Sequence, residues 1–187
     1  MAENPNAVVL VEGESDRVAL ETLARRRGRD LAAEGIEVVA IGGAQAIRRF
    51  VETYGPRGLD VPLAGLYDAG EQRDVARGLE RAGLGSALAR SDLERLGFFV
   101  CDADLEDELI RALGPGEVER IVDRHGDLRP FRTFQKQAAW NGRPTEHQLR
   151  RFMGSGGSRK VRYARHLVEA LDLAAVPRPL DLVLARV

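Results

Sequence analysis

Cysteine is almost missing from this sequence, and Cys101 is the only one. A single cysteine forms no internal disulfide and cannot supply the several thiolates of a zinc cluster. We therefore expect a protein of a reducing compartment, the cytoplasm, with Cys101 buried in its core. Histidine is also scarce. None of His125, His147 and His166 stands in a pattern typical of a general base, so we interpret them as surface or helix-capping residues.

Long apolar runs are missing too. The longest uncharged apolar stretches are far too short to span a bilayer, and Met1–Ala7 has no basic cluster of the kind that begins a secretory signal. No internal repeat or low-complexity tract interrupts the chain. The whole chain has 187 residues, of which 44% are hydrophobic and 30% are charged. This length and composition are typical of one soluble globular domain, with enough residues for a small additional segment.

Lysine is rare, and the basic residues are unevenly placed. Only Lys136 and Lys160 are lysines among 28 basic residues. Ten of the 28 lie between Arg129 and His166, where Glu146 is the single acid. An acidic remainder joined to a basic segment is what a metal-dependent enzyme acting on a polyanion needs, although a solvated helical surface would also carry such charges.

Four short apolar segments alternate with segments of helical periodicity. The expected strands are residues 8–11, 36–41, 62–67 and 98–101, and the helices between them cover residues 14–27, 47–54 and 75–82. This alternation predicts an α/β fold with right-handed crossovers and a four-stranded, mainly parallel sheet flanked by helices.

No strand pattern follows residue 109. Helical patterns cover residues 117–125, 128–140, 145–153, 158–173 and 180–187. We therefore predict a core over residues 1–110 and a helical, basic C-terminal extension over residues 111–187 that packs on this core.

Hydroxyl side chains mark three of the expected helix starts. Ser91 with Glu94, and Thr145 with Gln148, have the spacing of capping boxes. Ser158 stands directly after a glycine-rich turn, where it can cap the next helix. We expect each of these three residues to be the N-cap of a helix.

Acidic residues follow three of the expected strands. Glu12 ends the first, Asp68 follows the third, and the 102–108 cluster follows the fourth. Because the carboxyl ends of parallel strands meet at one edge of the sheet, these side chains should converge there, with Asp16 leaning back from the first helical turn. Converging carboxylates repel each other unless a cation lies between them, so we predict a divalent-metal site. The helix dipole alone explains an acid at Asp16 but not at Glu12.

Three motifs stand in order along residues 8–105. They are Glu12-Gly13 in V-E-G-E-S-D, the pair Gly42-Gly43, and Asp68 in L-Y-D-A-G. This ordered set resembles the Toprim domain that topoisomerases, bacterial primases, recombination mediators and a group of nucleases share. The resemblance implies a Rossmann-like, four-stranded sheet flanked by helices.

Later residues extend the resemblance to the end of the chain. Asp104-Leu105-Glu106 forms a D-x-E motif, and Gly154–Ser158 forms a glycine-rich turn that is followed by Lys160. With these motifs the chain is most similar to the Toprim nuclease part of the overcoming-lysogenization-defect (OLD) family. That resemblance implies a metal-dependent endonuclease that hydrolyses DNA.

The expected mechanism uses two Mg²⁺ or Mn²⁺ ions about 4 Å apart. The expected ligands are Glu12, Asp16 and Asp68 for one ion, and Asp104 and Glu106 for the other. We choose Asp104 over Asp102 on spacing, and capping or solvation explains Asp102 and Asp107 as well as metal contact does.

Glu12 and Lys160 are the expected catalytic residues, Lys160 because its charge would stabilise the pentavalent phosphate. A lysine in the first turn of a helix is disfavoured by the dipole, although simple solvation would also account for it. Five arginines would bind the DNA backbone with little sequence preference: Arg150, Arg151, Arg159, Arg162 and Arg165.

The chain departs from the family pattern at two points. The common D-x-D motif after the third strand has Gly70 in its second position, which Glu71 or the 102–108 cluster could replace. OLD nucleases also carry an ATPase domain before the Toprim part. Because this sequence shows none and Gly154–Lys160 lacks the spacing of a P-loop, we expect ATP dependence only through a separate ATPase partner.

Two other functions stay open. A small stand-alone Toprim protein could process structured RNA instead of DNA. A non-catalytic module that binds nucleic acid or partner proteins is favoured by Gly70. A homodimer is compatible with each function, and we interpret Trp140, Phe131 and Phe134 as helix-packing residues.

Overall fold

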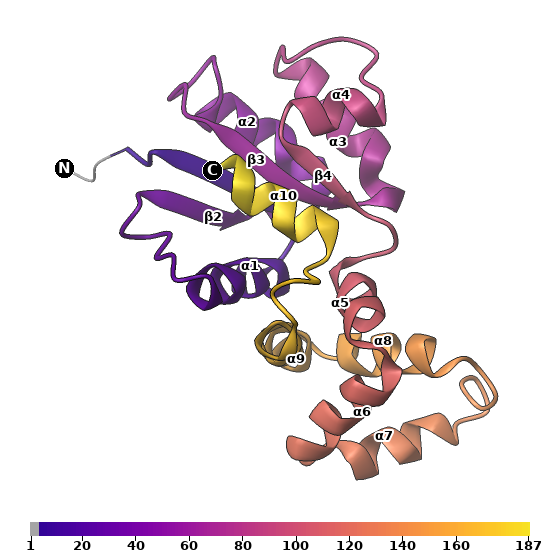
Figure 1. The fold of residues 1–187 in the computed structure, drawn as a ribbon. Coiled ribbons are helices and arrows are strands. Elements are labelled where there is room, and N and C mark those ends of the chain that lie inside the picture. Colours follow the sequence, from indigo (N-terminus) through magenta and orange to yellow (C-terminus); the bar gives the residue numbers. More distant parts are fainter. Residues whose placement is uncertain (1–3) are drawn as a thin grey trace.

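A computed structural model describes residues 4–187 and contains one four-stranded sheet (Figure 1). Its strands are β1 (Ala7–Val11), β2 (Ile36–Ala40), β3 (Leu63–Asp68) and β4 (Phe98–Cys101). The strand order is β2-β1-β3-β4, and every pairing is parallel. Val9 lies opposite Val38 and Ala64, and Asp68 lies opposite Cys101. The predicted α/β fold is confirmed.

Helices connect the strands and make up the rest of the chain. They are α1 (Glu14–Arg26), α2 (Ile47–Tyr54), α3 (Gln72–Arg81), α4 (Arg90–Arg95), α5 (Leu105–Leu113), α6 (Pro115–Arg124), α7 (Leu128–Gln135), α8 (Thr145–Gly154), α9 (Gly157–Ala170) and α10 (Arg178–Arg186), with 3-10 turns η1 (Ala44–Ala46) and η2 (Ala69–Glu71). Among residues 4–187, none of these helices is both long and apolar enough to cross a membrane.

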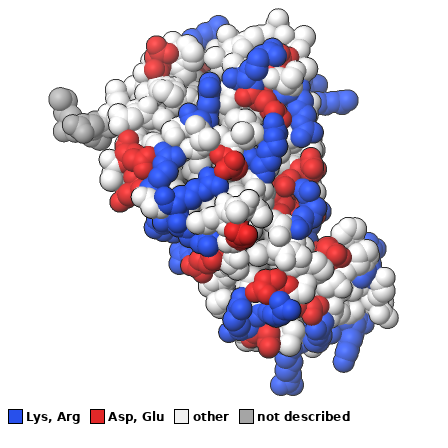
Figure 2. Space-filling view, in the orientation of Figure 1, with Lys and Arg blue, Asp and Glu red and all other residues white. Residues whose placement is uncertain are grey.

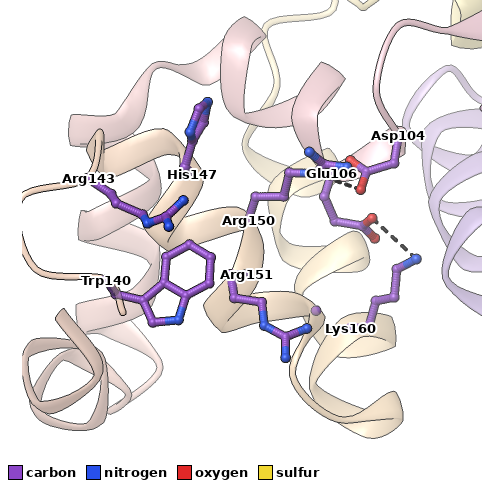
Figure 3. Close-up of a pocket in the computed structure, with 9 residues that line it drawn as sticks. Asp104, Glu106, Trp140, Arg143, His147, Arg150, Arg151 and Lys160 are labelled. Carbon is purple, nitrogen blue, oxygen red and sulfur yellow. Dashed lines mark hydrogen bonds and ion pairs between the residues drawn. The ribbon is translucent and has the colours of Figure 1, made fainter. Parts of the chain in front are cut away.

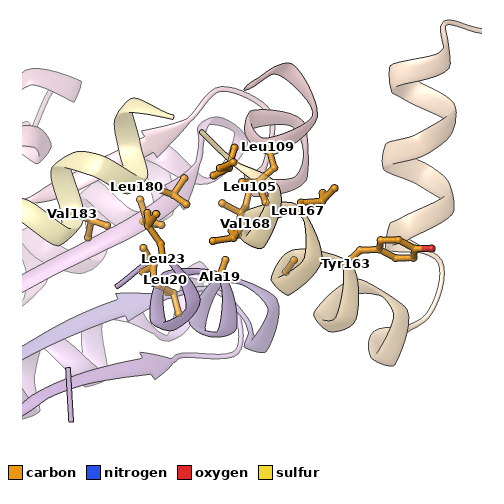
Figure 4. Packing of buried hydrophobic residues seen from close by; sticks show 14 of the residues in the cluster. Ala19, Leu20, Leu23, Leu105, Leu109, Tyr163, Leu167, Val168, Leu180 and Val183 are labelled. Carbon is orange, nitrogen blue, oxygen red and sulfur yellow. The ribbon is translucent and has the colours of Figure 1, made fainter. Parts of the chain in front are cut away.

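Both faces of the sheet are buried, as the continuous apolar strands require. Val9 and Val11 face a cluster that includes residues of α1, α9 and α10, part of which Figure 4 shows. Val8 and Leu10 face a second cluster with residues of α2, α3 and α4. The alternation of side chains along a strand thus places one helical layer on each face.

The helices after β4 leave the sheet and return to it. α5 to α8 form a projection beside the sheet, and α9 packs against α1 (Figure 1). α10 then packs on β3 and β4, where Leu180 and Val183 are buried with Leu66 and Phe99. The division at residue 110 into a core and an extension stays a prediction.

The predicted cap of α4 is wrong by two residues. The cap position is Ala89, and α4 begins at Arg90, so Ser91 lies inside the helix. Asp92, the third residue of the helix, accepts a hydrogen bond from the backbone N–H of Ala89 (2.8 Å). Glu94 is therefore not needed at the helix start, and it pairs with Arg178 instead (2.9 Å).

The predicted caps of α8 and α9 are also wrong. α8 follows Pro144, whose extended backbone (φ −50°, ψ 140°) ends the preceding loop without a side-chain cap. Gln148 is buried and makes other hydrogen bonds. α9 begins after Gly156, whose positive φ (110°) favours glycine, so Ser158 lies inside the helix.

Candidate functional site

Carboxylates gather at the edge of the sheet where the parallel strands end. Glu12 directly follows β1, Asp68 is the last residue of β3, and Asp104 precedes α5 just after β4. Burial, followed by the charges of Glu12, Asp104 and Asp16, raises the pKa of Asp68 to about 8. Acids that are distant in sequence thus all influence the half-buried carboxyl group of Asp68. We call Glu12, Asp16, Asp68, Glu71, Asp104 and Glu106 the acidic rim.

Asp16 reaches the acidic rim from the first turn of α1. Its Oδ2 accepts a hydrogen bond from the backbone N–H of Gly13 (2.8 Å), which fixes the tight turn after Glu12. Burial raises the pKa of Asp16, and the charges of Glu12 and Asp104 act in the same direction. The charge of Lys160 lowers the pKa of Asp16, so the lysine of α9 lies close enough to Asp16 to interact with it electrostatically.

Glu71 follows Gly70 in sequence and places a carboxylate near Glu12. Burial and the neighbouring Glu12 carboxylate raise the pKa of Glu71 to about 7, although a hydrogen bond from the backbone of Ala44 lowers it. Oε2 of Glu71 is buried and has no hydrogen-bond partner. Glu71 is therefore a carboxylate beside Glu12 with one oxygen unsatisfied.

Glu106 and Lys160 form the most buried ion pair of the rim (Figure 3). Lys160 Nζ lies 3.3 Å from Oε2 of Glu106, whose side chain is only 3% exposed. Burial raises the pKa of Glu106 to about 7 even though Lys160 lowers it. Burial lowers the pKa of Lys160, but the charges of Glu106 and Asp16 outweigh burial and raise it. Oε1 of Glu106 has no hydrogen-bond partner.

Asp104 stands on the rim, and its two acidic neighbours point elsewhere. Oδ1 of Asp104 caps α5 by accepting from the backbone N–H of Asp107 (2.8 Å), and Oδ2 accepts from Nε of Arg150 (2.7 Å). Asp102 and Asp107 both pair with Arg111, at 3.7 and 2.9 Å. Asp102 lines a different cavity from the one that Asp104 and Glu106 share.

The rim has the right donors for a divalent cation but is not closed around one. Within residues 4–187, no three acidic, histidine or cysteine side chains lie close enough together to hold a metal ion. Lys160 and Arg150 are instead paired with Glu106 and Asp104. The unpartnered oxygens of Glu71 and Glu106 are the hard donors that Mg²⁺ and Mn²⁺ prefer. The residues therefore fit such an ion chemically, provided that the carboxylates draw together.

A cavity of about 420 Å³ opens beside the rim (Figure 3). Its lining residues come from α5, the loop between α7 and α8, α8 itself and α9: Asp104, Glu106, Trp140, Arg143, His147, Arg150, Arg151, Gly154 and Lys160. From the sequence, Trp140 is expected to pack between helices and His147 to lie on the surface, and nothing there points to Arg143 as a site residue. The sequence indicates only that the segment between Arg129 and His166 is basic, and this does not distinguish Arg143 from the other arginines.

The five arginines predicted to bind DNA lie on several surfaces. Arg150 and Arg151 line the cavity beside the rim. Arg159 lies over the ring of Phe152 and lines a second cavity, while Arg162 and Arg165 line a third. Arg162 is already paired with Asp127. Acids from outside the basic segment thus offset part of its charge, and the structure does not gather the five into one strip.

A family model matches part of this sequence, and solved structures share its fold. Residues 6–69 match the family model of the overcoming lysogenization defect protein-like TOPRIM domain. The C-terminal region of the OLD protein of Xanthomonas campestris pv. campestris superposes with a TM-score of 0.76 at 23% identity, over 97% of this chain and 91% of that one. The same region of the Burkholderia pseudomallei OLD protein gives 0.73 at 20% identity, over 97% and 96%. No curated protein sequence matches the chain.

The predicted resemblance is thereby confirmed. The first two Toprim motifs and the start of the third lie inside the matched residues 6–69. The structural likeness extends over α5 to α10, which the D-x-E and Lys160 motifs predicted. An OLD-like Toprim domain is consistent with a family of nucleases.

Proposed function

Since residues 6–69 carry an OLD-like Toprim domain, we propose that this chain is a divalent-metal-dependent endonuclease that hydrolyses DNA phosphodiester bonds. The proposal is supported above all by Lys160 and Glu106, a lysine and a buried carboxylate from the helical part, which lie beside carboxylates at the strand ends. The carboxylates supply the anionic donors that divalent cations need, and the lysine supplies a positive charge for the DNA phosphate.

The rim residues divide into two sets of ligands. Glu12, Asp16, Asp68 and Glu71 would hold one Mg²⁺ or Mn²⁺, and Asp104 with Glu106 would hold the other. Bound there, the ions would supply an activated water and stabilise the leaving oxygen. Lys160, released from Glu106 as that carboxylate turns to a cation, would offset the charge that develops on the phosphate.

A plasmid assay tests this proposal. Supercoiled DNA is incubated with the full chain and Mg²⁺ or Mn²⁺, with and without added ATP, and nicked and linear products are measured. The test variants are Glu12→Gln and Lys160→Ala. The matched controls are Glu37→Gln, an exposed acid of β2, and Lys136→Ala, the only other lysine.

We expect each test variant to lose about a hundredfold or more in cleavage rate, since it removes a charge at the reacting centre. The two controls should cut like the unaltered chain. Equal cleavage by all five proteins, or cleavage that persists in excess chelator, would contradict the proposed function.

A non-catalytic nucleic-acid or partner-binding module is the second candidate. Gly70 in place of an aspartate favours it, as does the absence of a closed metal site within residues 4–187. Calorimetric titration with Mg²⁺ and Mn²⁺ separates the two candidates, because a module of this kind would bind neither ion at millimolar concentration. Structured RNA run beside the plasmid tests the RNA-processing alternative.

A further inference from the structure

The cavity beside the rim has a wall that the proposed chemistry does not use. Two residues of the acidic rim, Asp104 and Glu106, line this cavity together with Lys160. If a DNA phosphate binds at the rim, the adjacent nucleotide of the strand therefore lies at the cavity. The opposite wall carries an aromatic ring and basic side chains, notably Trp140 and Arg151 (Figure 3). This wall belongs to the loop after α7 and to α8.

Trp140 is held in place from two sides. Its backbone carbonyl accepts a hydrogen bond from Nε2 of Gln148 (2.8 Å), a side chain that is only 5% exposed. Oε1 of Gln148 accepts in turn from Nε2 of Gln135 (2.6 Å). The indole stacks on Phe134, with ring centroids 5.2 Å apart and an angle of 29° between the planes. Because the indole of Trp140 is already fixed, it loses little conformational freedom when a nucleotide base stacks on it.

The same wall carries positive charge for a phosphate. Cζ of Arg143 lies 5.2 Å from the centroid of the Trp140 ring, and its Nε donates to the carbonyl of Ala139 (2.8 Å). Guanidinium planes and indoles are both surfaces on which bases stack. Arg150 is bonded to Asp104, but the exposed Arg151 has no acidic partner within residues 4–187.

We propose that this cavity binds one nucleotide of a DNA strand next to the scissile phosphate, with its base stacked on the Trp140 and Arg143 wall and its phosphate on Arg151. The inference rests on the proposed function and names its substrate: single-stranded DNA or a frayed end. A cavity of about 420 Å³ lies within the range of small-ligand sites. A paired base must leave its stack to enter it, which disfavours intact duplex.

The experiment uses Trp140 as its own reporter, because it is the only tryptophan. A single-stranded oligothymidylate of about ten nucleotides is titrated into the full-length Glu12→Gln variant with Mg²⁺, and again into the unaltered chain in chelator. The same titrations are made with a duplex and with oligouridylate. We expect a change in tryptophan emission that saturates, with the single strand bound at least tenfold more tightly than the duplex.

Cleavage by variants gives a second readout. Trp140→Ala should cut single-stranded DNA about tenfold more slowly, and Trp140→Phe should retain most of the rate. Arg151→Ala should weaken strand binding, whereas Arg81→Ala, an exposed arginine at the far end of α3, should not. Thermal melting checks that each variant is folded.

Emission that does not change with either strand, together with unaltered cutting by Trp140→Ala and Arg151→Ala, would overturn the inference. Tighter binding of oligouridylate than of oligothymidylate would also overturn it, in favour of an RNA strand. Metal-dependent plasmid cleavage in the same preparations would leave the proposed function standing in both cases.

Discussion

Gly70 is the one position at which this rim differs from the common Toprim pattern, and the structure leaves room for the missing side chain. A Cβ placed on Gly70 would meet no atom within 4 Å, and the residue is exposed. Its backbone is outside the left-handed region, so an aspartate fits without strain. Glu71 next to it already supplies a carboxylate with an unsatisfied oxygen.

We predict that Gly70→Asp tightens Mg²⁺ binding by about tenfold, since it adds a hard anionic donor to the rim. Calorimetry measures the affinity, and the plasmid assay measures the rate. Glu71→Gln should change the affinity in the opposite direction. An aspartate that leaves both affinity and rate unchanged would show that Gly70 lies outside the metal site.

Asp68 also makes stability depend on pH. Its pKa is about 8 in the folded chain against an ordinary value of 3.8, so the folded state holds a proton that the unfolded state has lost. The stability from this group is complete below pH 3.8 and is lost as pH rises through about 8. In chelator, therefore, Asp68→Asn should unfold at a urea concentration that falls less between pH 5 and pH 8 than that of the unaltered chain. Parallel pH profiles for the two proteins would contradict this.

The bounds of β4 and α1 were predicted well from the sequence, whereas the capping residues of α4, α8 and α9 were not. β4 spans Phe98–Cys101 as expected, and α1 ends one residue early at Arg26. The helix predicted to reach Trp140 ends at Gln135 instead. Buried Gln148 binds both Gln135 and the carbonyl of Trp140 across the loop, and no local pattern reveals that tertiary contact.

The same distinction holds for the site. Parallel strands oblige Glu12, Asp68 and Asp104 to meet, so the acidic rim could be inferred from strand order. The pairing of Lys160 with Glu106 follows from the packing of α9 and could not be inferred from the sequence. Motif resemblance and an unfavourable position in the helix dipole pointed to the lysine but not to its partner. Trp140 could not be placed, because its loop is shaped by contacts with α8.

α9 links stability to the site because it carries Lys160 and packs on α1, which carries Asp16. Leu167 of α9 is fully buried in the shared core (Figure 4). We predict that Leu167→Ala lowers the free energy of unfolding by roughly 2–5 kcal/mol, as cavities in cores do. Val161→Ala, at a half-exposed position of α9, should cost about 1 kcal/mol or less. Urea unfolding measures both, and equal losses would mean that α9 is not anchored through Leu167.

Across the whole molecule, ion pairs with acids from other segments partly neutralise the basic segment between Arg129 and His166. Figure 2 shows basic and acidic side chains interspersed over the face in view. Arg132 pairs with Glu119 (2.7 Å), and Arg162 pairs with Asp127, although all the acids but one lie outside the basic segment. Arginines without an acidic partner should therefore contribute most to the salt dependence of DNA binding, because each releases a condensed counterion when it neutralises a phosphate.

Arg165 and Arg162 offer a comparison of this effect. Arg165→Ala should reduce the slope of log affinity for DNA against log salt by about one, if its charge meets a phosphate. Arg162→Ala should reduce the slope by less, because Asp127 already neutralises it. Fluorescence anisotropy with a labelled strand at several salt concentrations gives both slopes. A larger effect for Arg162 would show that its pairing with Asp127 breaks on binding.

The return of α10 to β3 and β4 has a mechanical consequence for the whole chain. A projection that leaves the sheet after β4 and is fastened again by Leu180 and Val183 is attached at two points. Such an arm can flex but cannot swivel about a single joint. These two attachments, together with the packing of α9 on α1, therefore hold Lys160 at a fixed distance from the acids at the strand ends.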